Sequence, residues 1–212
     1  MHSQTLEGTR LALHGIAELV LAGPQYAESH DIRLRVTPGG FGTVTAPHLE
    51  VDGLELVTPR TRLPIGGTFA GLARAAGVDA RPLRDVYTGG PDFDPDEPVV
   101  IDPRAAGTVL DAFARGDDAL RRFAPDVEAV LWPEHFDLGI SLGEVNYGVS
   151  PGDVHVPEPY AYVGPWTPRI GAFWNTDFGA AKQLTELEGA DALMAFFEEG
   201  ARRTAADPRR PS

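Results

Sequence analysis

Apolar and polar residues alternate along this chain with two periods, which predict helices and strands. A period near 3.6 indicates an amphipathic helix, and a period of two indicates a half-buried strand. In residues 1–87 the pattern predicts a helix over 6–22 that ends at Gly23-Pro24, a strand over 32–36, a hairpin over 49–57 with an Asp52-Gly53 turn, and a helix over 68–76 that ends at Gly77.

The same periods recur after residues 88–98, an acidic segment rich in proline and glycine. They predict a helix over 103–123 with Asp102 as its N-cap, short strands over 127–163 and a helix over 190–205. We therefore expect an N-terminal half (1–87), a connector (88–102) and a C-terminal half (103–206), with one compact domain as the alternative. The predicted fold class is α+β, with a mostly antiparallel sheet and helices packed on one face.

Both predicted halves follow the order helix, strands, helix, which raises the hypothesis of an internal duplication. An offset of 95 residues aligns Asp31 with Asp126, Pro38 with Pro133 and Phe41 with Phe136. Independent use of common turn residues is the alternative, because three identities are few. Two similar halves therefore remain a hypothesis for the structure to test.

The C-terminal half contains a second hairpin, whose register the pattern of residues 135–150 predicts. A Leu142-Gly143 turn would pair Leu138 with Tyr147 and place the large apolar side chains on one face. A slip of one residue would destroy this sorting. The other face would then carry the polar residues and two glycines of the hairpin: His135, Asp137, Gly139, Glu144, Asn146 and Gly148.

Imidazole and carboxylate groups gather on this polar face and in the segment that follows it. Such groups are the ligands of Zn²⁺, Mn²⁺ or Fe²⁺. The candidate metal ligands are His135, Asp137, Asp153 and His155. A free carboxylate of Glu144 or Glu158 would take the proton of a metal-bound water, so a metal-dependent hydrolase of a small molecule is the leading hypothesis. The same groups would also suit general acid–base catalysis without a metal.

Two other interpretations of this face stay open. Gly139 and Gly148 would leave space for a ligand, and aromatic residues line the segment. A non-catalytic protein that binds a small polar molecule through Asn146, Tyr160 and Tyr162 is therefore the alternative function. The simplest interpretation is an ordinary solvated face of an antiparallel sheet.

A second candidate for ligand binding lies in the N-terminal half. Arg33 and Arg35 share a strand face and lead into a glycine-rich loop, residues 38–42. Guanidinium groups and free backbone N–H groups would suit a carboxylate or a phosphate. The alternative is that both arginines pair across strands with Glu50 or Glu55.

Composition narrows the class of partner and the compartment. The 18 basic and 31 acidic residues give a net charge of −13, which disfavours nucleic acids and anionic membranes as partners. No apolar run approaches the roughly 18 residues of a membrane span. With no cysteine, the chain has neither disulfides nor thiolate chemistry. We expect a cytoplasmic protein, and leave a homo-oligomer open.

Two runs of the C-terminal half resemble a group of uncharacterised, mainly actinobacterial proteins. The runs are LWPEHFDL at 131–138 and EPYAY at 158–162, and the group carries a similar Trp-Pro-x-His-Phe-Asp run followed by a Glu-Pro-Tyr segment. The resemblance covers about 40 residues. It implies an actinobacterial source and no particular activity.

Overall fold

The computed structural model describes residues 2–210, which divide into two compact units. Unit 1 contains the residues up to 111 together with 130–136, and unit 2 contains 112–129 and the residues from 137 onward. The division therefore differs from the predicted one at 88–102. That acidic connector belongs to unit 1, where the Val99 N–H donates to the Gly67 carbonyl and the Ala70 N–H donates to the Pro95 carbonyl.

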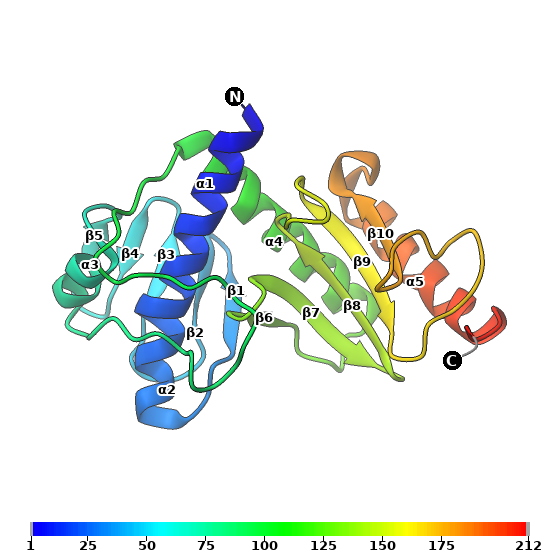
Figure 1. Cartoon of the computed structure of the whole chain (residues 1–212), viewed down its shortest axis with the longest axis horizontal. Helices are drawn as coiled ribbons and strands as arrows, with labels where there is room; N and C mark the ends of the chain where they lie inside the picture. Colours follow the sequence, from blue (N-terminus) through cyan, green and yellow to red (C-terminus); the bar gives the residue numbers. More distant parts are fainter. Residues whose placement is uncertain (1, 211–212) are drawn as a thin grey trace. The chain divides into compact units, whose positions relative to one another are not determined.

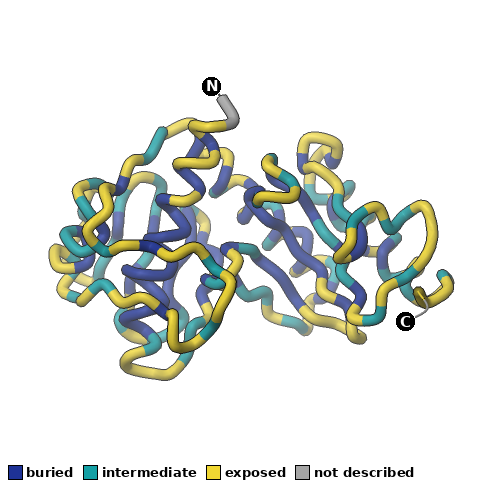
Figure 2. Tube along the Cα trace, in the orientation of Figure 1, coloured by how far each residue is buried: buried dark blue, intermediate teal, exposed yellow. Residues whose placement is uncertain are grey.

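Unit 1 is a six-stranded antiparallel sheet with helices against it (Figure 1). The strand order is β6-β1-β2-β3-β4-β5. Its elements are α1 (His2–Gly15), η1 (Ile16–Ala22), α2 (Gly23–Ser29), β1 (Leu34–Thr37), β2 (Gly40–Thr43), β3 (Glu50–Asp52), β4 (Glu55–Val57), β5 (Arg62–Pro64), α3 (Phe69–Ala76) and β6 (Val130–Trp132). Every residue of η1 is buried, and η1 contacts β1 and β2 (Figure 2). The core of unit 1 therefore lies between this helix and the sheet.

The first helix does not end at Gly23-Pro24 as predicted but continues to Ser29. Its middle part, η1, is a π-helix, in which the Gly23 N–H donates to the Glu18 carbonyl. Pro24 has no N–H to offer to Leu19, five residues earlier. The Arg81 N–H, from a distant loop, donates to the Leu19 carbonyl instead, at 2.9 Å. The wider turn therefore accommodates the proline without leaving a buried carbonyl unpaired.

Unit 2 is a four-stranded antiparallel sheet in the order β10-β9-β8-β7. Its strands are β7 (Asp137–Leu142), β8 (Val145–Ser150), β9 (Tyr160–Pro165) and β10 (Ala180–Gln183), followed by η2 (Leu184–Glu186) and α5 (Gly189–Ala206). Helix α4 (Pro103–Phe123) begins in unit 1, and its part from residue 112 belongs to unit 2.

Helices α4 and α5 pack on one face of the unit 2 sheet, as the sequence predicted. A Cβ at Gly116 of α4 would lie 2.9 Å from the Val149 side chain, and one at Gly200 of α5 would lie 2.6 Å from Val163. These glycines let the helix backbones approach the strands closely. The α+β class with antiparallel strands is thus confirmed.

The predicted register of the β7–β8 hairpin is wrong by two residues. Leu138 pairs with Val149 and Leu142 pairs with Val145, so the turn consists of Gly143 and Glu144. Both turn residues have positive φ, 59° and 62°, as a type I′ turn requires. A shift of two residues leaves each side chain on the same face, so the apolar sorting could not distinguish the two registers.

The two halves of the chain share an order of elements. Helices α1 to α2, strands β1–β5 and helix α3 are followed by α4, β6–β10 and α5. Consecutive strands pair antiparallel in chain order within β1–β5 and within β7–β10. The shared order agrees with an internal duplication, which stays a prediction.

Candidate functional site

The polar face of the unit 2 sheet carries Asp137, Gly139, Gly148 and Tyr162 side by side, because strand pairing places Gly148 opposite both Gly139 and Tyr162. The Tyr162 hydroxyl donates a hydrogen bond to the Asp137 carboxylate. A Cβ would lie 2.4 Å from the Tyr162 hydroxyl oxygen at Gly148 and 2.7 Å from it at Gly139. The two glycines therefore make room for the Tyr162 ring, rather than for a ligand.

Asp153, a predicted metal ligand, organises its own loop. Its Oδ1 accepts the N–H groups of His155 and Val156 at 2.7 and 2.8 Å, and its Oδ2 accepts the Tyr160 hydroxyl at 2.5 Å. Burial opposes ionisation of Asp153, but these hydrogen bonds outweigh it and lower its pKa. Burial, and then the contact with Asp153, raise the pKa of Tyr160. The pair thus ties the loop to β9 with an ionised carboxylate and a protonated phenol.

The other predicted site residues of the C-terminal half lie in different local surroundings. His135 belongs to unit 1, and its side chain is 65% exposed with Glu134 at 3.9 Å. His155 and Glu144 are exposed, Glu158 is half-buried, and Asn146 accepts hydrogen bonds from Ser141 and Trp166. Within residues 2–210, no group of three or more His, Asp or Glu side chains is arranged to hold a metal ion.

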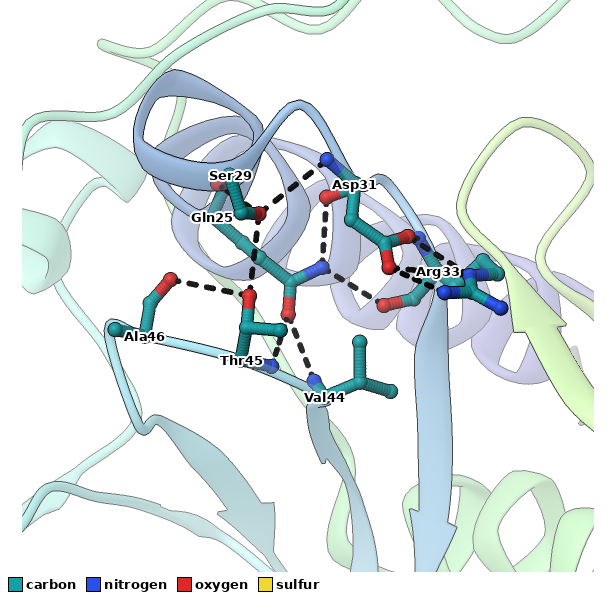
Figure 3. Close-up of polar contacts among 7 residues, drawn as sticks. All are labelled: Gln25, Ser29, Asp31, Arg33, Val44, Thr45 and Ala46. Atoms are coloured by element: carbon teal, nitrogen blue, oxygen red, sulfur yellow. Dashed lines mark hydrogen bonds and ion pairs between the residues drawn. The ribbon is translucent and has the colours of Figure 1, made fainter.

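The arginines of the N-terminal half pair with carboxylates. Arg33 binds Asp31 through Nε and Nη2, with a shortest distance of 2.6 Å (Figure 3). Arg35 lies 3.8 Å from Glu50 across the strands, so this one of the predicted pairings is confirmed. Buried Gln25 beside them donates to the carbonyls of Asp31 and Arg33, which fixes the start of β1.

The glycine-rich segment that follows Arg35 does not form an anion-binding loop. Residues 40–43 form β2, which pairs with β1 on one side and with β3 on the other. A Cβ at Gly40 would lie 2.2 Å from the Val51 carbonyl oxygen. The glycines therefore serve close strand packing, and the ladders occupy backbone N–H groups that the prediction had left free.

A groove on unit 1, which the sequence did not predict, is a further candidate for ligand binding. It has a volume of about 430 Å³ and lies between α1, the start of α3 and residues 93–102. Its lining is formed by Gln4, Thr5, Gly8, Thr9, Leu11, Ala12, Phe69, Phe93, Glu97, Pro98, Val100 and Asp102. Small residues at 8 and 12, one helical turn apart on α1, leave the space open.

Backbone contacts hold the far wall of the groove in place. The Asp102 N–H donates to the Thr9 hydroxyl at 3.0 Å. The N–H groups of Phe69 and Ala70 donate to the carbonyls of Glu97 and Pro95. The wall is therefore joined to α1 and to α3.

A buried histidine supports the groove from behind. His14 packs edge-on against Phe93 and stacks on Phe136, with ring centroids 5.1 Å apart in both pairs. Its Nε2 donates to the Pro133 carbonyl at 2.6 Å. Burial lowers the pKa of His14 to about 4, so the ring is neutral at pH 7.

One turn beyond His14, buried Glu18 anchors the loop at 83–87. Its carboxylate accepts the Leu83 N–H at 3.2 Å and the Tyr87 hydroxyl at 2.9 Å. Burial raises the pKa of Glu18, and burial together with Glu18 raises that of Tyr87. Three buried polar residues follow one another at intervals of four on the same helix face: Arg10, His14 and Glu18. This spacing could have indicated from the sequence that they form a row.

Comparison with known proteins does not narrow the function. No protein-family model, curated protein or solved structure matches this chain. In the part of the chain that the structure describes, no helix has both the length and the apolar character needed to cross a membrane. The site residues themselves must therefore carry any functional argument.

Proposed function

We propose that this protein is a non-catalytic binding protein, which takes a small molecule with an apolar body into the groove of unit 1. The volume of about 430 Å³ is the observation that carries this proposal. Pockets for small molecules typically measure roughly 300–1,000 Å³ and combine apolar walls with a few polar groups. Phe69 and Phe93 line this groove. In this proposal they are the aromatic walls of the pocket, in place of Tyr160 and Tyr162, which the sequence hypothesis had named.

The polar residues that line the groove favour binding over catalysis, because of their types and because of the hydrogen bonds that they already make within the protein. Its lining residues include no histidine, serine or lysine. The Thr9 side chain is buried and its hydroxyl accepts the Asp102 N–H. Asp102 in turn caps α4, where its Oδ1 accepts the N–H groups of Arg104 and Ala105. No activated nucleophile with a neighbouring base is therefore assembled among these residues.

Filling the groove from Gly8 tests the proposal. A Cβ at Gly8 meets no atom within 4 Å, so the side chain of Gly8→Leu begins in open space at the lining of the groove. Leucine also has the higher helix propensity, so the fold should tolerate the change. We expect the neutral fluorescent probe N-phenyl-1-naphthylamine to bind the wild-type protein with one site per chain, and Gly8→Leu to weaken that binding at least tenfold.

Gly107 provides the matched control. It also lies in a helix, also meets nothing within 4 Å of its Cβ position, and does not line the groove. Gly107→Leu should bind the probe like the wild type. Equal affinities of the wild type and Gly8→Leu, or no saturable binding to the wild type, would contradict the proposed function.

A further inference from the structure

The charge of the groove points to one class of ligand. Glu97 and Asp102 are the ionisable residues of its lining, and none of the twelve lining residues is basic. Asp94 and Asp96 precede them in the same segment, and the Glu97 N–H donates to the Asp94 carbonyl. Any ligand in the groove therefore meets two carboxylates and no compensating cation in the lining.

Neither carboxylate is saturated by the protein. Within residues 2–210, the Glu97 carboxylate makes no hydrogen bond or ion pair. Asp102 uses Oδ1 as the cap of α4, while the described contacts leave its Oδ2 available. An exposed glutamate without a partner is ordinary on a surface, but here the carboxylates border an apolar cavity. A charge at such a border interacts more strongly than one in open water, because the local dielectric constant is lower.

We propose that the ligand of this groove is a small organic cation, an amine carried on an aromatic or aliphatic body. This inference rests on the proposed function and adds the charge of the ligand to it. The apolar body lies against Phe69, Phe93 and Leu11, and the ammonium group faces Glu97 and Asp102. Anions are disfavoured twice, by these two carboxylates and by the net charge of −13, which also steers cations toward the protein. A volume of about 430 Å³ suits a single small molecule rather than a polypeptide.

Three probes that share one ring system test the sign of the charge. 1-Naphthylmethylamine is cationic at pH 7, 1-naphthylmethanol is neutral and 1-naphthoate is anionic. Competition against N-phenyl-1-naphthylamine gives the affinity of each. We expect the amine to bind at least tenfold more tightly than the alcohol, and the alcohol more tightly than the acid. Raising the salt concentration should reduce the differences in affinity among the amine, the alcohol and the acid, because salt screens the charges.

A pair of charge-neutralising variants tests which residues cause the preference. Glu97→Gln with Asp102→Asn removes both charges, and asparagine still caps a helix. The matched control is Glu7→Gln with Asp85→Asn, two exposed acidic residues of unit 1 outside the lining. The first double variant should lose the preference for the amine and keep its affinity for the alcohol, whereas the control should keep both.

The outcomes separate the two proposals. Equal binding of the three naphthyl probes, or an amine preference that both double variants change equally, would overturn the cation inference and leave the binding groove in place. If the wild-type protein binds none of the probes, including N-phenyl-1-naphthylamine, the proposed function itself is overturned.

Discussion

The Tyr162 hydroxyl donates to the Asp137 carboxylate across the unit 2 sheet, and its ring occupies the space that Gly139 and Gly148 leave open. This contact explains three features of the sequence together. The carboxylate accepts the hydrogen bond of a half-buried phenol, the phenol ring covers the strands, and the two glycines leave room for both. Tyr162 and Asp137 are thus paired with each other on the polar face, and the ring covers the two glycines that the sequence analysis had offered as space for a ligand.

Gly148→Ala should destabilise the protein, because its new methyl group would lie 2.3 Å from the Leu138 carbonyl oxygen and 2.4 Å from the Tyr162 hydroxyl. Overpacking of this kind costs about 1–3 kcal/mol in the free energy of unfolding. Urea denaturation measures the loss. Gly164→Ala is the control on the same face, because the nearest atom to its Cβ would be 3.4 Å away, an ordinary contact. Equal effects of the two substitutions would contradict the packing argument.

Tyr162→Phe should cost about 2 kcal/mol of stability, because it removes a hydrogen bond to a charged acceptor. Asp137→Asn weakens the same hydrogen bond from the other side. The double variant should therefore be more stable than the sum of the single effects predicts, with a coupling of about 1 kcal/mol. Urea denaturation of the four proteins in this cycle gives the coupling. Strict additivity would show that Tyr162 and Asp137 do not interact.

The sequence predicted which face each side chain of the β7–β8 hairpin occupies, but not its register. Periodicity of two distinguishes odd from even shifts only, so pairing Leu138 with Tyr147 or with Val149 sorts the residues equally well. The turn decides between them, and there Glu144 adopts a positive φ of 62°, which few non-glycine residues do. The Asp52-Gly53 hairpin shows the same difference, since Asp52 pairs with Glu55 and the turn is Gly53-Leu54.

The groove could not be predicted in this way, because it depends on the distance between segments remote in sequence. Gly8 and Ala12 read as ordinary small residues of an amphipathic helix. Phe93 lies in a segment whose composition suggested an exposed connector, and yet it is buried. The hydrogen bond between Thr9 and Asp102, 93 residues apart, brings the connector against α1. No local pattern of the sequence predicts a contact over such a separation.

We expect the purified protein to contain far less than one equivalent of zinc, manganese or iron. Asp153 has both carboxylate oxygens engaged, and no group of three ligands is arranged within residues 2–210. Elemental analysis by mass spectrometry after dialysis measures the metal content. A stoichiometric metal that His135→Ala removes would instead support the hydrolase hypothesis that the sequence raised.

The stability of the protein should fall on acidification from pH 6.5 to pH 4, partly because of His14. Burial lowers the pKa of His14 from 6.5 to about 4 in the folded chain, whereas the unfolded chain keeps the ordinary value. Between these pH values the unfolded state binds a proton that the folded state does not. The free energy of unfolding therefore rises with pH in this window, and it decreases as the pH falls from 6.5 to about 4. The difference of 2.5 pKa units corresponds to about 3 kcal/mol.

His14→Phe keeps a flat ring between Phe93 and Phe136 but cannot titrate. Although the lost hydrogen bond to Pro133 lowers its stability at neutral pH, its stability should depend less on pH across this window, by about that amount. Urea denaturation at half-unit intervals of pH measures both slopes, with the exposed His48→Gln as the control that should follow the wild type. Parallel slopes for the wild type and His14→Phe would show that His14 does not take up a proton on unfolding, and hence that it is not held neutral behind the groove.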